Sequence, residues 1–141
     1  MRRPSRQCAP IVIVVDASVI ATALTDADLP GHRVRARLVD EVLGAPELLD
    51  LEVLSVMRRH VRAGRLGVHQ AHRVLLELRA LPIERASHHV LVSRCWELRD
   101  NLSPYDAAYV ALAERLGVVL VTADSRLARA HGIRCTVEVL R

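Results

Sequence analysis

The chain has 141 residues and a formal net charge of +4, with 51% hydrophobic and 26% charged residues. This length fits a single domain that can bury a proper core. Aromatic residues make up only 2% and phenylalanine is absent, so the core must be built from Leu, Val, Ile and Ala. That composition favours helices packed on a buried sheet over an all-β sandwich.

The chain contains three cysteines: Cys8, Cys95 and Cys135. This sparse, odd number without a C-x-x-C pair argues against a disulfide framework or a zinc ribbon and fits a reducing compartment. No apolar run approaches the roughly 18 residues of a membrane span. The basic start is a poor signal peptide, because Asp16 interrupts the apolar run behind it. We therefore expect a cytoplasmic protein without a membrane segment, with a basic, flexible tail over residues 1–10 and one domain over residues 11–141.

The first predicted element is a strand over residues 11–15, where β-branched residues follow one another without alternation. Such a run is typical of a strand buried on both faces of a parallel sheet. Helices are then expected over residues 17–24, 32–43, 46–63 and 68–81, with a loop at 25–32 and a break at 44–46. A strand at 82–86 is followed by helices at 87–100 and 104–116, a strand at 118–122, a helical turn at 125–130 and a strand at 133–140. Strands that alternate with helices predict a mostly parallel, three-layer α/β domain.

Three carboxylates are predicted to converge at one edge of this sheet. Asp16 directly follows the first strand, and Asp124 follows the strand at 118–122 by two residues. The helix that begins at Pro104 runs antiparallel to the strand that it feeds, so its N-terminus, with Asp106, lies at the same edge. In open α/β sheets, functional sites lie beyond the carboxyl ends of the strands. Taken singly, each acid is also a common turn or capping residue.

Carboxylates gathered at one edge repel one another, which points to a bound cation. Two like charges about 4 Å apart repel by about 4 kcal/mol at an effective dielectric of ~20. Helix-dipole contacts of about 0.3–1 kcal/mol each do not offset several such pairs. Oxygen ligands without His or Cys at metal spacing indicate Mg²⁺ or Mn²⁺. A fourth acid, Glu52, interrupts the apolar stripe of the helix at 46–63. Taken alone, it is typical of an exposed helix residue, and the sequence pattern does not place it at the sheet edge.

Four segments carry these acids in order: IVIVVDASVI, APELLDLEVLSVMRR, LSPYDAAYVALAERLG and VVLVTADSRL. In order and spacing they resemble PIN-domain proteins, and within that family the VapC-type toxins of bacterial toxin–antitoxin pairs. The resemblance covers about residues 11–140. It implies a three-layer α/β/α domain with a mostly parallel central sheet. It also implies a Mg²⁺- or Mn²⁺-dependent endoribonuclease that cleaves RNA by metal-assisted phosphodiester hydrolysis.

The resemblance also implies residue roles and partners. The family's acidic quartet of catalytic residues and metal ligands is matched by Asp16, Glu52, Asp106 and Asp124. Ser18 and Thr122 match hydroxyl residues that support the first and last acids, although ordinary capping explains them equally well. The expected partners are an RNA substrate, a cognate VapB-type antitoxin and a second copy of the chain in a homodimer. Family members often begin almost at the first strand, so the role of the tail over residues 1–10 stays open.

Arginines near the acids are candidates for holding RNA. All 20 basic residues are arginine, whose forked guanidinium suits phosphate, although a coding bias explains this composition as well. Arg59 lies seven residues after Glu52, two turns along the same helical face, and Arg126 lies just after Asp124. Each could reach a phosphate beside the metal; the alternatives are a solvated face or an antitoxin contact. With one Trp, two Tyr and no Phe, recognition by base stacking is not expected.

Three competing interpretations are tested against the same residues. A phospho-acceptor receiver domain also places acids at the carboxyl edge, but its chemistry needs a lysine on the last strand and this chain has none. A haloacid-dehalogenase-type phosphatase needs D-x-D after the first strand, where this chain has D-A-S. The alternative from another class is a non-catalytic RNA- or partner-binding module in which the quartet is structural.

Overall fold

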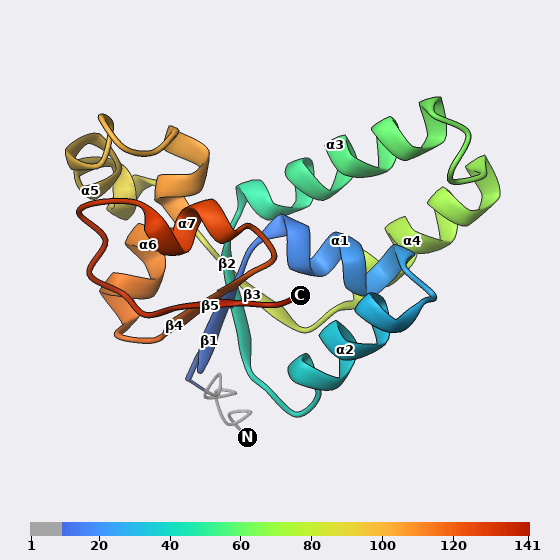
Figure 1. Ribbon diagram of the computed structural model, residues 1–141, viewed down its shortest axis with the longest axis horizontal. Helices are drawn as coiled ribbons and strands as arrows, with labels where there is room; N and C mark the ends of the chain where they lie inside the picture. Colours follow the sequence, from blue (N-terminus) through green and yellow to red (C-terminus); the bar gives the residue numbers. More distant parts are fainter. Residues whose placement is uncertain (1–9) are drawn as a thin grey trace, which may run out of the picture.

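The structure, a computed structural model, describes residues 10–141 and has a five-stranded sheet at its centre (Figure 1). The strands are β1 (Ile13–Val15), β2 (Leu43–Pro46), β3 (Ile83–Ala86), β4 (Val119–Thr122) and β5 (Val137–Val139). They lie in the order β3-β2-β1-β4-β5, and each neighbouring pair is parallel. The predicted α/β fold is therefore confirmed, whereas the predicted tail lies, up to residue 9, outside the described residues.

Two layers of helices cover the sheet (Figure 1). The helices are α1 (Ala17–Thr25), α2 (Leu29–Leu38), α3 (Leu48–Arg62), α4 (Val68–Ala80), the short 3₁₀ helix η1 (His89–Leu91), α5 (Val92–Glu97), α6 (Pro104–Leu116) and α7 (Ser125–Arg129). Helix α1 packs against α2, α3 and α4 on one side, while α6 packs against β1, β2 and β4 and carries α5 on its outer surface. Within residues 10–141, no helix has the length and apolar character needed to cross a membrane.

The apolar runs of the sequence form the core of the sheet and of α6. Ile13, Val14 and Val15 of β1 are all buried, as expected for a parallel strand with helices on both faces. Helix α6 is buried without interruption over residues 107–113, because it lies between the sheet and α5. Gly117 ends α6 with φ of 66°, a left-handed conformation that glycine adopts without steric cost. The chain can therefore turn directly into β4.

Strand β2 was not predicted, and the expected helix over residues 32–43 is wrong at both ends. Helix α2 ends at Leu38, and the chain then enters β2, whose sequence Leu-Gly-Ala-Pro has no β-branched residue. The strand lies fully buried between β1 and β3. Its small residues serve close packing: a Cβ on Gly44 would lie 2.6 Å from the Ile11 side chain. Packing on both sides thus overrides a weak strand propensity.

Two other predicted elements are shorter in the structure. The helix expected over residues 87–100 is divided into η1 and α5, which ends at Glu97. The strand expected over residues 133–140 is limited to Val137–Val139. In each region an apolar residue outside the shortened element, Leu98 or Ile133, still packs with the core, so the sequence pattern extends beyond the hydrogen-bonded element.

The direction of the strand connections reverses between β1 and β4. From β1 the chain moves outward to β2 and β3, and it then returns through α5 and α6 to β4 on the other side of β1. The Asp16 amide N–H donates to the Val121 carbonyl across this junction at 3.3 Å. Such a switch point, at the carboxyl ends of the strands, is where open α/β sheets bind ligands.

Candidate active site

Asp16 is the buried centre of the site, with only 6% of its surface exposed. It is the N-cap of α1, where its Oδ1 accepts a hydrogen bond from the Val19 amide at 3.2 Å. The Ser18 hydroxyl donates to the same oxygen at 2.5 Å, and the Thr122 hydroxyl donates to Oδ2. The capping role and the site role therefore coincide in one side chain, whose orientation is fixed by three donors.

The two predicted hydroxyl residues join the loops that follow β1 and β4. Besides holding Asp16, the Thr122 hydroxyl accepts a hydrogen bond from the Asp124 amide at 2.9 Å. The Ser18 hydroxyl accepts one from the Ala123 amide at 3.1 Å. These contacts hold the loop of Asp124 against the start of α1. Ser18 and Thr122 thus lie where the sequence placed them, and their contacts position both acids.

Asp106 reaches the same edge through the start of α6. Ser103 is the N-cap, and its side-chain oxygen accepts from the Asp106 amide at 3.2 Å, with Pro104 as the first helical residue. This local pattern fixes the beginning of α6 at the carboxyl ends of the strands. The Asp106 carboxylate lines the cavity beside Asp16.

Glu52 joins the acids from α3, which the sequence alone did not establish. The Tyr109 hydroxyl of α6 donates to Glu52 Oε1 at 2.6 Å. Tyr109 is only 2% exposed, so its ring is held by the core while its hydroxyl meets the carboxylate. Tyr109 was not predicted as a site residue. Its one available signal is its position three residues after Asp106, on nearly the same face of α6.

The four acids line one open cavity of about 250 Å³. Asp16 approaches it from the junction of β1 and α1, and Asp124 from the loop between β4 and α7; Glu52 lies on α3 and Asp106 on α6. The other lining side chains include Ser18, Ser55, Arg59 and Tyr109. The convergence predicted for three acids is thus present in the structure, and Glu52 completes the group.

Burial and mutual repulsion oppose ionisation of three of these acids. Burial raises the pKa of Asp16, and the charge of Asp106 raises it further, although hydrogen bonds to Ser18 and Thr122 act in the opposite direction. Burial and then the neighbouring Asp106 and Asp16 raise the pKa of Glu52. Burial and then Asp124 raise the pKa of Asp106. Keeping these three acids ionised therefore costs free energy, and a bound cation would reduce that cost.

Asp124 differs because an arginine neutralises it. The guanidinium of Arg126 donates to both carboxylate oxygens, with Nη2 at 2.8 Å from Oδ2 and Nε at 3.1 Å from Oδ1. This contact lowers the pKa of Asp124. Of the two predicted RNA-binding arginines, Arg126 is thus an ion-pair partner of the site, whereas Arg59 lines the acidic cavity directly.

The donor set fits a hard divalent cation in its chemistry. Carboxylate oxygens from four acids surround one cavity, together with serine hydroxyls, and these are the ligands that Mg²⁺ and Mn²⁺ prefer. Within residues 10–141, no three His, Cys, Asp or Glu side chains are arranged as a ready-made metal-binding group. Instead, hydroxyls hold Asp16 and Glu52, and a guanidinium holds Asp124.

The parallel sheet and its cluster of acids are those of a nuclease domain, and comparisons with known proteins agree. The family model described as PIN domain matches residues 13–133, so the chain belongs to the PIN-domain family. Its relatives are VapC ribonucleases. Ribonuclease VapC9 of Mycobacterium tuberculosis is 42% identical over 129 residues, which cover 92% of this chain and 98% of that protein. Ribonuclease VapC3 of the same species is 43% identical over 128 residues, covering 91% and 93%.

A solved structure supports the same fold. The crystal structure of PAE2754 from Pyrobaculum aerophilum superimposes with a TM-score of 0.63 at 25% identity, covering 92% of this chain and 84% of that chain. The resemblance inferred from the four acidic segments is therefore confirmed at the level of family and fold.

Proposed function

We propose that this protein is an endoribonuclease that acts as the toxin of a type II toxin–antitoxin pair and cleaves RNA by metal-assisted phosphodiester hydrolysis. The observation that carries this proposal is the convergence of Asp16, Glu52, Asp106 and Asp124 on one cavity at the switch point of the sheet. The VapC ribonucleases among its relatives, about 40% identical over most of the chain, support the same reaction.

The roles of the acids follow from their surroundings. When bound there, Mg²⁺ or Mn²⁺ would lower the pKa of a water molecule and stabilise negative charge on the phosphate. Asp16 and Asp106 are the central candidates to hold the cation, since burial raises the pKa of both and neighbouring carboxylates raise it further, a cost of ionisation that a bound cation would relieve. Glu52 would complete the group in the orientation set by Tyr109. Asp124, paired with Arg126, would be a weaker or water-mediated ligand.

The protein surface supports partner binding as part of this proposal. Large apolar side chains are exposed on the helices α3 and α4 and around α5; they include Leu51, Val68, Leu76, Val92 and Trp96. Contiguous exposed apolar patches mark protein interfaces, and α3 packs directly against α4. We assign them to a VapB-type antitoxin and to a second copy of the chain in a homodimer, in the cytoplasm. Light scattering tests the homodimer, and relief of growth arrest by the neighbouring gene's product tests the antitoxin.

The catalytic assignment is tested by RNA cleavage assays of wild type and Asp106→Asn. We expect wild type to cleave single-stranded RNA with Mg²⁺ or Mn²⁺ and to stop on addition of EDTA. Asp106→Asn should fall to the level seen with EDTA, because one carboxylate of the cluster is lost. Its metal-free form should be at least as stable as wild type in urea, since burial and then the charge of Asp124 raise the pKa of Asp106 in the folded state.

A matched control separates the site from general effects of the substitution. Asp100 is an exposed aspartate six residues before Asp106 and outside the acidic cavity, so Asp100→Asn should cleave RNA like wild type. Equal cleavage by wild type and Asp106→Asn would overturn the catalytic role of the quartet. It would favour the non-catalytic binding module instead.

A further inference from the structure

A second cavity, of about 500 Å³, adjoins the acidic cavity and is here called the α7 cavity. It shares Asp106 and Asp124 with the acidic cavity, and its outer wall carries Arg126 and Arg129 of α7. The loop before α6 contributes the amide of Asn101 and the hydroxyl of Ser103. One cavity thus presents two guanidinium groups and two neutral polar groups beside the acids.

The two arginines differ in what they already bind. The Arg129 side chain is exposed and forms no hydrogen bond or ion pair with any residue from 10 to 141, although its charge contributes to lowering the pKa of Asp124. Arg126, with 81% of its side chain exposed, forms its ion pair with Asp124 alone within the same range. Among the described residues, the guanidinium of Arg129 is therefore available to a ligand, whereas that of Arg126 is already paired with Asp124.

The chemistry of the α7 cavity fits a phosphodiester better than a base. Guanidinium forks bind phosphate oxygens in a bidentate manner, and Asn101 and Ser103 can each donate a further hydrogen bond. The apolar part of the lining is Leu102, Leu127 and Ala130, without an aromatic ring. Base stacking therefore has no platform here, and contacts would be independent of the RNA sequence.

We propose that the α7 cavity binds the RNA phosphate next to the one that is cleaved. The proposal rests on the proposed function, since it places this phosphate beside the acidic cavity. Arg129 is its first contact, and Arg126 is a second contact that exchanges its ion pair with Asp124 for the phosphate. Arg59, on the α3 wall of the acidic cavity and outside the α7 cavity, lies toward the opposite end. The RNA backbone therefore crosses the carboxyl edge of the sheet from α3 to α7.

The test is the affinity of the metal-free protein for a fluorescently labelled single-stranded RNA, measured in EDTA at several salt concentrations. Arg129→Gln should weaken binding about tenfold, the effect of one charge-assisted contact. It should also reduce the slope of log affinity against log salt by about 0.7. The control is Arg115→Gln, which removes an exposed arginine at the other end of α6. This control should bind RNA with the affinity and salt slope of wild type.

A double-mutant cycle tests the exchange of Arg126. In otherwise wild-type protein, Arg126→Gln should reduce RNA affinity by less than Arg129→Gln, because Asp124 retains Arg126. In an Asp124→Asn background, Arg126→Gln should reduce affinity about as much as Arg129→Gln. Equal effects of Arg126→Gln in the two backgrounds would overturn the exchange.

The outcomes separate this proposal from the proposed function. If wild type cleaves RNA but Arg129→Gln retains the affinity and salt slope of wild type, the α7 cavity is not the phosphate site and the proposed function still stands. If wild type neither binds nor cleaves RNA, both proposals are overturned. Circular dichroism of Arg129→Gln should match wild type, because the exposed side chain contributes nothing to the core.

Discussion

At the scale of single residues, the site depends on groups that orient the acids as well as on the acids themselves. The Tyr109 hydroxyl is the clearest example, because it bonds Glu52 across the interface of α6 and α3. Its pKa is raised by burial and by the adjacent Glu52 carboxylate, so it remains a neutral donor. Tyr109 therefore acts as a positioning residue that selects one orientation of Glu52.

Tyr109→Phe should test this role while keeping the ring in the core. We expect metal affinity, measured by calorimetry with Mn²⁺, to fall about 10–100-fold, as for other partners of metal ligands. Cleavage should recover at higher metal concentration, and the free energy of unfolding should fall by about 1 kcal/mol. Tyr105→Phe is the matched control, since Tyr105 is exposed on the same helix. If the two variants have the same metal dependence, Tyr109 has a packing role only.

The residues show which parts of the site a sequence can reveal. Asp16 and Asp124 were predictable because each follows a strand, and all parallel strands end at the same edge. Asp106 was predictable because a helix start is fixed by its cap. Glu52 lies within a helix, where its direction depends on how α3 packs, and the sequence does not encode that packing locally. The role of Tyr109 was not predictable, because a tyrosine within an apolar helix is expected to pack in the core.

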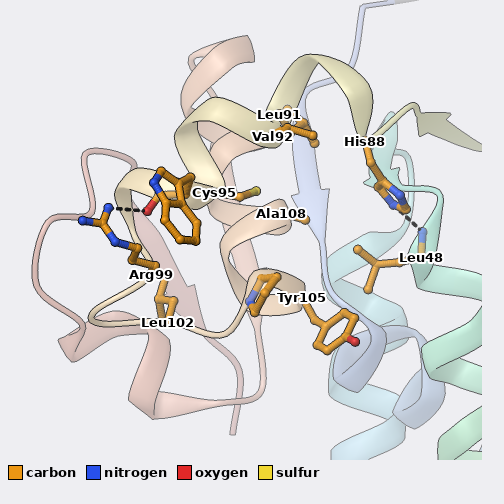
Figure 2. A pocket seen from close by; sticks show the side chains of 11 residues that line it. Leu48, His88, Leu91, Val92, Cys95, Arg99, Leu102, Tyr105 and Ala108 are labelled. Atoms are coloured by element: carbon orange, nitrogen blue, oxygen red, sulfur yellow. Dashed lines mark hydrogen bonds between the residues drawn. The ribbon is translucent and has the colours of Figure 1, made fainter.

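At the scale of elements, α3 must be held in place for Glu52 to reach the cavity. Two contacts at its first turn do this. The Leu48 amide donates to His88 Nε2 at 3.0 Å, as Figure 2 shows. The Arg85 guanidinium of β3 forms two hydrogen bonds with Asp50, at 2.8 and 2.9 Å. Because Glu47 provides no side-chain cap, His88 takes over that role from a distant part of the chain.

His88→Ala should therefore lower the free energy of unfolding by about 1 kcal/mol, the usual cost of a lost helix cap. His88→Gln should recover most of this loss, since its Oε1 can accept the Leu48 amide hydrogen in place of Nε2. The neighbouring His89 is exposed and contributes no side-chain hydrogen bond among the described residues, so His89→Ala is the control. Urea denaturation measures all three. A loss of equal size in His88→Gln and His88→Ala would show that packing, and not the cap, determines the effect.

At the scale of the whole molecule, acidic residues occur in two kinds of surroundings. At one edge of the sheet they repel one another, and elsewhere they form stabilising ion pairs. The second kind is seen at Glu114 of α6. Arg94 of α5 donates to both of its oxygens, at 2.7 and 3.1 Å, and the Arg134 amide donates at 2.7 Å. Arg94 also donates to the Gly132 carbonyl at 2.6 Å. One carboxylate thus links α5, α6 and the segment that enters β5.

Glu114 should make stability depend on pH in the direction opposite to the acids of the site. Burial alone would raise its pKa, but the hydrogen bonds from Arg94 and Arg134 outweigh burial and lower it below the ordinary 4.5. The folded state then binds this proton less tightly than the unfolded state, so the stabilisation is complete above pH 4.5 and is lost as pH falls through the folded-state pKa.

Glu114→Gln should cost about 2 kcal/mol at neutral pH, and its urea midpoint should converge with that of wild type in acid. Glu97→Gln, which removes the other, 59% exposed partner of Arg94, should cost about 0.5 kcal/mol or less. A Glu114→Gln deficit that persists unchanged in acid would mean that the group stabilises the fold by shape and not by charge.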